Sequence, residues 1–130
     1  MEFSSRQFGD VVLATPVGRI DHAAAPAHEA KLLPLVDREG GPRLSVVLDF
    51  GGVDYISSVG LRVLMVAARH ARARAMRIGV SALQPIVSEI FAISRFDAVL
   101  DIYPTVRAAL ASVSQTALVE FDQAQAPPPA

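Results

Sequence analysis

A buried strand that leads directly into an amphipathic helix constrains this chain more than any other segment. Residues 44–50 hold a run of aliphatic and β-branched side chains, which is typical of a strand covered on both faces. Gly51 and Gly52 supply a turn, and apolar residues then recur at helical spacing from Leu61, which predicts a helix over residues 58–73. A strand and a helix joined in this way are the basic unit of an α/β domain.

The rest of the chain repeats this alternation after an N-terminal hairpin. Residues 2–8 and 11–17 are expected to form two strands around the tight turn Gly9-Asp10. Helices and strands then alternate, which favours parallel strands joined by right-handed crossovers. The further expected elements are a helix kinked at Pro34 and ended by residues 38–42, strands over residues 76–82 and 99–103, a helix from Pro85 with Ile86, Ile90 and Ile93 as its buried face, and a helix from Pro104.

The length and composition are those of one domain. At 130 residues, of which 52% are hydrophobic, the chain has enough apolar side chains for a substantial core. We place the domain at residues 1–114 and expect a tail over residues 115–130, disordered at least over residues 126–130. Three apolar residues of the tail are expected either on the domain or on a partner: Leu118, Val119 and Phe121.

The overall charge and residue content exclude several classes of function. A net charge of −1 gives no reason to expect nucleic acid or a membrane surface as a partner. The absence of cysteine excludes disulfides, cysteine nucleophiles and thiolate metal sites, and it fits a cytoplasmic protein. No apolar run approaches the ~20 residues that a membrane helix needs, and the first residues do not resemble a signal peptide. We therefore expect no membrane insertion, cofactor or metal.

Patterns that would indicate catalysis are also missing. His22 and His28 are six residues apart rather than at the i, i+4 spacing of a helical metal site, and they are expected at the surface or as caps. A hydrolase using Ser58 would need a triad pattern that the sequence lacks. A run of basic residues is expected to form a solvated helix face; it comprises Arg62, Arg69, His70, Arg72, Arg74 and Arg77. Arg62 is the exception, because it lies one turn from Ser58 and could bind an acidic partner or a phosphate.

Ser57 and Ser58 stand where the strand gives way to the helix of residues 58–73. Backbone N–H groups at a helix N-terminus are unpaired, and the positive end of the helix dipole favours an oxygen or an anion there. Serine is among the best residues for capping such an end, so one of the two is accounted for by structure alone. The second serine leaves a hydroxyl for another role.

Three short segments, in this order, resemble the STAS domain, the fold of bacterial anti-sigma-factor antagonists. Gly18-Arg19-Ile20-Asp21-His22 resembles a segment whose Asp lies in the family's partner-binding surface. Tyr55-Ile56-Ser57-Ser58-Val59-Gly60-Leu61 is similar to the family's phosphorylation loop, and Leu83-Gln84-Pro85-Ile86-Val87 to the junction before its third helix. The resemblance runs from about Phe3 to Val113. It implies an α/β sandwich in which a mixed sheet of four to five strands carries about four helices, mainly on one face.

The resemblance also implies a function. An unmodified domain of this family binds an anti-sigma factor that is also a Ser/Thr kinase, the kinase phosphorylates the domain, and a metal-dependent phosphatase reverses the modification. Ser58 matches the phosphoacceptor position. The family's preceding Asp is Ser57 here, which makes Ser57 the alternative phosphoacceptor. The implied partner-binding residues are Asp21, His22, Ser57, Ser58, Val59, Gly60, Leu61 and Arg62.

Two questions stay open at this point. The missing Asp favours an alternative in which the same fold is an unphosphorylated scaffold in a lipid-transport, stressosome-like or transporter-associated assembly. Gly60 is expected to keep a docking surface free of side chains, in which case Gly60→Ala keeps or raises stability while weakening binding. If Gly60 instead packs against neighbouring backbone, the same change lowers stability.

Overall fold

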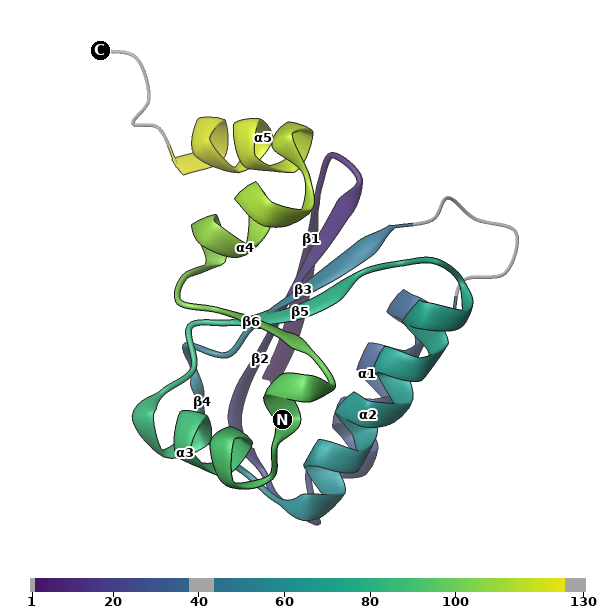
Figure 1. Ribbon diagram of the computed structural model, residues 1–130, viewed down its shortest axis with the longest axis vertical. Coiled ribbons are helices and arrows are strands. Elements are labelled where there is room, and N and C mark those ends of the chain that lie inside the picture. Colours follow the sequence, from purple (N-terminus) through teal and green to yellow (C-terminus); the bar gives the residue numbers. More distant parts are fainter. Residues whose placement is uncertain (1, 38–43, 126–130) are drawn as a thin grey trace.

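The computed structural model describes residues 2–37 and 44–125 of the chain (Figure 1). The elements are β1 (Glu2–Phe8), β2 (Val11–Ile20), α1 (Ala25–Val36), β3 (Ser45–Asp49), β4 (Val53–Ile56), α2 (Ser58–Ala73), β5 (Ile78–Ser81), α3 (Pro85–Ile93), the 3-10 turn η1 (Phe96–Ala98), β6 (Asp101–Tyr103), α4 (Val106–Val113) and α5 (Gln115–Gln125). The predicted α/β sandwich is confirmed, with more strands and helices than expected. Residues 38–42, predicted to end the first helix, lie outside the described residues.

A single mixed sheet forms the centre of the molecule. Its strand order is β1-β2-β3-β5-β6, with β1 antiparallel to β2 and the remaining neighbours parallel. Successive side chains of β3 point to opposite faces: Val46 and Leu48 enter one hydrophobic cluster and Val47 enters a second. The first cluster includes residues of α1, α2, α3 and η1, whereas the second lies under α4 and α5.

One strand of the sheet was not predicted. Val53–Ile56 forms β4, which pairs with the far end of β2, beyond the stretch of β2 that pairs with β3. The pairing exists because β2 runs to Ile20 rather than ending at residue 17. Gly18 has a φ of +106°, and the register of the β2–β4 pair shifts between Gly18 and Arg19. Glycine is suited to such an irregularity because it lacks a Cβ.

The sequence predicted α1 better than the buried face of α3. Pro34 lies inside α1, which continues to Val36, and it occupies an exposed position where water can replace the lost hydrogen bond. In α3 the buried residues are Val87 and Phe91. Of the predicted buried face, Ile90 is partly buried against the first hydrophobic cluster, but the prediction was wrong for Ile86 and Ile93, which are 53% and 77% exposed.

Residues 115–125 form α5, where the sequence predicted only a tail. Ser114 begins this last helix: its Oγ accepts the N–H of Ala117 at 3.2 Å and donates a hydrogen bond to Asp10. Leu118 is buried in the second hydrophobic cluster, and the ring of Phe121 meets Phe8 edge-on at 5.5 Å. The sequence left open whether the apolar residues of this segment pack on the domain or on a partner. Leu118 and Phe121 pack on the domain. Residues 126–130 lie outside the described residues.

Candidate functional site

The pairing of β2 with β4 brings the first two sequence motifs together. Ile20 and Ile56 are partners in this parallel pair, so the residues that follow them leave the sheet at the same edge. The backbone N–H of Ser57 donates to the carbonyl of Ile20 at 2.8 Å, which continues the ladder to the first residue of the loop. The Asp21-His22 turn and the start of α2 are thus neighbours, as the resemblance implied.

Ser57 serves the fold. It is the N-cap of α2, its backbone is extended, and its Oγ accepts the N–H of Gly60 at 3.2 Å. Only 5% of the residue is exposed. A capping hydroxyl of this kind contributes about 1 kcal/mol to stability. Its hydroxyl is therefore held inside the structure by an interaction that the helix needs.

Ser58 is the first residue of α2 and is exposed. Together with Val59 and Arg62 it lines a shallow open hollow at the surface. The first turn of α2 contains no acidic residue, so the positive end of the helix dipole is not offset from within the helix. A negative group placed on Ser58 would meet this end of the dipole and lie one turn from the Arg62 guanidinium.

Asp21 is held by two contacts. Its Oδ1 accepts the N–H of Ala24 at 2.9 Å, so it caps the turn that precedes α1 rather than α1 itself. Its Oδ2 lies 3.8 Å from Nε of Arg19, and the Arg19 guanidinium stacks 4.2 Å from the ring centroid of Tyr55. His22 next to it is exposed.

Besides Ser57, two residues of the predicted binding surface face inward. Leu61 is 9% exposed and belongs to the first hydrophobic cluster. Gly60 is buried, and a Cβ built on it would lie 2.7 Å from Cγ1 of Ile56 and 2.8 Å from Cγ2 of Ile20. The expectation that Gly60 keeps an outer surface clear is therefore wrong, because the space that it leaves free is inside the domain. The side chains that this edge offers to solvent come from His22, Ser58 and Arg62, with Asp21 and Val59 partly exposed.

Sequence reasoning did not include Arg19 and Tyr55 in the site. They are partners in the β2–β4 pair and are brought together by it. In the third motif, Nε2 of Gln84 donates to the carbonyl of Gly51 at 2.8 Å, which attaches the start of α3 to the turn that precedes β4. Sequence analysis did not predict β4, and without that strand the proximity of Arg19 and Tyr55 could not be predicted either.

Comparison with known proteins agrees with the fold and the motifs. An α/β domain with an exposed serine at the N-terminus of a helix is the class of protein that this geometry defines. The chain belongs to the STAS domain family, whose model matches residues 2–109. It is 38% identical over 120 residues to a Bordetella bronchiseptica protein that carries the name anti-sigma factor antagonist BtrV, covering 91% of this chain and 98% of the relative.

Solved structures share the fold. The Bacillus anti-sigma factor antagonist SpoIIAA in its unphosphorylated form superposes with a TM-score of 0.71 and 20% identity, over 86% of this chain and 96% of that one. Its phosphorylated form gives 0.66 and 19%, over 87% and 100%. The STAS domain of a SulP transporter from Vibrio cholerae gives 0.59 and 19%, over 84% and 81%. Among the described helices, none has the length and apolar character to cross a membrane.

Proposed function

We propose that this chain is a cytoplasmic anti-sigma-factor antagonist that acts in a phosphorylation-controlled partner switch, without enzymatic activity of its own. In its unmodified form it binds an anti-sigma factor that is also a Ser/Thr kinase. The kinase phosphorylates Ser58, and a metal-dependent phosphatase restores the free hydroxyl. The observation that carries this proposal is the division of labour between the two serines: Ser57 is buried and caps α2, whereas Ser58 is exposed.

The chemistry of the position suits a switch. Phosphorylation adds about −1.5 to −2 charges at pH 7. The fold tolerates this charge, because a helix N-terminus stabilises anions. A partner docked over Ser58 would instead have to strip water from the phosphate, and an unpaired buried charge is strongly unfavourable. Modification can therefore release the partner without unfolding the domain.

The surface that we assign to the partner surrounds this hydroxyl. It consists of Asp21 and His22 from the turn after β2, and of Ser58, Val59 and Arg62 from the first two turns of α2. Ser57, Gly60 and Leu61 support this surface from below, since all three are buried. The identity of 38% to BtrV supports the antagonist role.

The test is the intact mass of the protein purified from its own host, with and without phosphatase treatment. We expect part of the wild-type population to carry an extra ~80 Da, the mass of one phosphoryl group on a serine hydroxyl, and to lose it on treatment. Ser58→Ala should not gain this mass. Ser57→Asp is the matched control, because Asp also caps helices well and restores the residue that the family has there; it should still be phosphorylated.

Two results would contradict the assignment. Phosphorylation of Ser58→Ala but not of Ser57→Asp would move the acceptor to Ser57. The absence of phosphate on either serine, in a host that contains the kinase, would favour the unphosphorylated scaffold. That second function has one observation in its favour, which is the replacement of the family's Asp by Ser57.

A further inference from the structure

Helix α2 is strongly basic in a chain whose net charge is −1. Within Ser58–Ala73 the charged residues are Arg62, Arg69 and Arg72, accompanied by His70, and no Asp or Glu is present. Arg69 and Arg72 are three residues apart, and like charges at this spacing repel each other on a helix surface. The helix therefore carries a charge that it does not balance itself.

These arginines lie on one face of α2. Ser58, Arg62, Met65, Arg69 and Arg72 follow one another at intervals of four, three, four and three residues, the spacing of a single helical stripe. At 1.5 Å per residue the stripe is about 21 Å long. It begins at the proposed phosphoacceptor and continues well beyond the surface assigned to the partner above. We refer to these five residues as the basic stripe.

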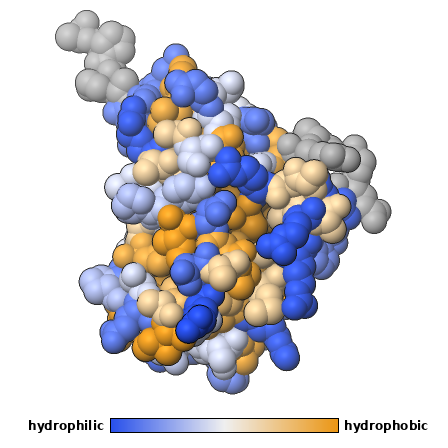
Figure 2. All heavy atoms as spheres, in the orientation of Figure 1, coloured by the Kyte–Doolittle hydropathy of each residue, from blue (hydrophilic) through white to orange (hydrophobic). Residues whose placement is uncertain are grey.

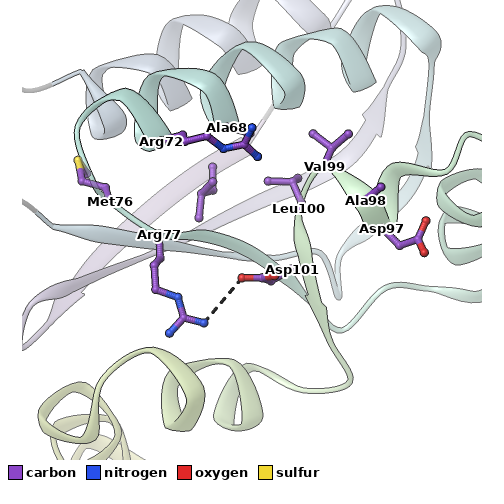
Figure 3. Close-up of a pocket in the computed structure, with 10 residues that line it drawn as sticks. Ala68, Arg72, Met76, Arg77, Asp97, Ala98, Val99, Leu100 and Asp101 are labelled. Carbon is purple, nitrogen blue, oxygen red and sulfur yellow. Dashed lines mark ion pairs between the residues drawn. The ribbon is translucent and has the colours of Figure 1, made fainter.

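A groove runs beside the C-terminal half of the basic stripe. Its volume is about 240 Å³, and it separates the end of α2 from η1 and β6 (Figure 3). Arg72 extends from α2 toward the wall that carries Val99 and Leu100, while Asp97 points away from it. A neighbouring hollow continues the groove along Met65 and Arg69, toward the N-terminus of α2. In Figure 2, hydrophobic surface in the middle of the view is bordered on the right by hydrophilic side chains over α2.

The stripe arginines differ from the basic residues around them in having no partner among the described residues. Arg74 pairs with Asp37. Arg77 lies 3.7 Å from Asp101 and donates to Tyr103 and Ser112. By contrast, no ion pair or hydrogen bond within residues 2–37 and 44–125 involves the side chain of Arg62, Arg69 or Arg72.

We propose that the basic stripe and its groove bind an acidic amphipathic helix of the partner protein. This inference rests on the proposed function and specifies the chemistry of the partner. The 4-3-4-3 spacing is that of a seam between two packed helices. Met65 and Val99, both partly buried hydrophobic residues, provide apolar contact, and the unpaired arginines provide complementary charge. A nucleic acid fits less well, because the residues that line the groove include no aromatic side chain on which a base could stack.

The basic stripe also extends the region of α2 in which phosphorylation of Ser58 would affect partner binding. A phosphate on Ser58 would lie at the N-terminal end of the basic stripe, on the same face of α2 that binds the acidic helix. It would repel the carboxylates of that helix and compete with them for Arg62. Phosphorylation would thereby weaken contacts along α2 in addition to those at the Ser58 surface.

The probe for this proposal is a fluorescein-labelled acidic peptide, stapled so that it is helical as a monomer, with Leu on one face and Glu flanking it. Its twin has Gln in place of every Glu. The double variant R69Q/R72Q removes two stripe charges outside the Ser58 surface, and R6Q/K31Q removes two charges from β1 and α1. We expect fluorescence anisotropy at low ionic strength to give at least tenfold weaker binding for R69Q/R72Q and unchanged binding for R6Q/K31Q. Wild type should bind the Gln twin at least tenfold more weakly, and Ser58→Asp should bind the acidic peptide severalfold more weakly.

The opposite results overturn the proposal. Equal losses in the two double variants would show non-specific attraction, and equal binding of the Gln twin would show that charge is not recognised. No binding to wild type, or a dimer that R69Q/R72Q dissociates in sedimentation, would exclude an acidic helix as the occupant. Phosphorylation of Ser58 is measured by mass without the peptide. A chain that is phosphorylated but does not bind the peptide would therefore contradict this inference alone.

Discussion

At the scale of single residues, the tightest constraint lies at Gly60. A Cβ at this position would lie 2.7 Å from Ile56 and 2.8 Å from Ile20, and 3.1 Å from the backbone oxygen of Ile20. That oxygen cannot move freely, because it accepts the N–H of Ser57. Glycine here allows α2 to begin directly against the end of β2, which is how the two halves of the site come together.

The first prediction concerns this contact. Gly60→Ala adds a methyl group to a filled space, and overpacking of this kind costs about 1–3 kcal/mol. Alanine recovers roughly 0.5–1 kcal/mol through its higher helix propensity. We expect a net loss of stability, measured as a lower urea midpoint with an unchanged m-value. Arg62→Ala, at an exposed position of the same helix, should change the midpoint little. A Gly60→Ala protein as stable as wild type would contradict the packing described here.

The residue scale is also where the sequence was least informative. Ser57 and Ser58 are identical in type and adjacent, so composition and spacing could not separate a buried cap from an exposed hydroxyl. His28 offered a signal that was not used: Ala25, His28, Leu32 and Val36 share a helical face, and all four are buried. The expectation of a surface or capping histidine at position 28 was wrong for this reason.

At the scale of elements, the alternating pattern predicted most of the domain, and the departures have physical causes. β4 has only four residues after a Gly-Gly turn, too few to show a period. In α3, the exposed isoleucines fit helical spacing as well as the buried Val87 and Phe91 do, and periodicity cannot tell which stripe faces the core. α5 follows α4 with only Ser114 between them, and its large apolar residues Leu118, Val119 and Phe121 lie within four consecutive positions, too few to show a helical period.

The second prediction tests the docking of α5. Leu118 is 8% exposed in the second hydrophobic cluster, whereas its neighbour Val119 is 46% exposed. Truncating a buried leucine to alanine costs about 2–5 kcal/mol, through lost burial and the cavity left behind. We expect Leu118→Ala to lower the free energy of unfolding by an amount in this range. Val119→Ala, the matched change on the exposed side, should shift it by less than about 0.5 kcal/mol. Equal effects of the two variants in urea titrations would show that α5 does not cover this face.

At the scale of the whole molecule, one sheet has two cores with different tasks. The first, under α1, α2 and α3, fixes the edge at which β2 and β4 end, from which Asp21 and Ser58 follow. The second, under α4 and α5, closes the opposite face. Because the proposed partner surface lies at the end of β2 and β4 and on the outer face of α2, its exposed side chains can change without loss of either core. The sequence motifs predicted this edge, but the depth of each residue below the surface required the packed structure.

The last prediction concerns the pH dependence of global stability. His28 is fully buried, and neither ring nitrogen has a hydrogen-bond partner among the described residues. Its ring lies 5.8 Å from that of Phe3, centroid to centroid. Burial disfavours the charged imidazolium and lowers the pKa of His28 from 6.5 to about 4. The folded protein therefore keeps this histidine neutral under conditions in which the unfolded chain binds a proton.

The sign of the effect follows from proton binding. Between pH 6.5 and about 4 the unfolded state binds the proton and the folded state does not, so stability falls as the pH falls through this window. Each unit of pKa difference corresponds to about 1.4 kcal/mol, so the full loss is on the order of 3 kcal/mol and levels off below the pKa of the folded state. Above pH 6.5 both states are neutral at His28, and the residue adds no pH dependence there.

The measurement is a series of urea titrations from pH 7.5 to 4.5 on wild type and two variants. His28→Leu keeps a side chain of similar size, removes the titrating group and buries no unpaired nitrogen. It should therefore be more stable than wild type near neutral pH and lose less stability on acidification. His22→Gln, at the exposed histidine, should follow the wild-type curve. Carboxylates titrate alike in all three proteins, so the difference between curves isolates His28. If His28→Leu and wild type lose the same free energy over this range, the buried histidine is not the source of the acid sensitivity.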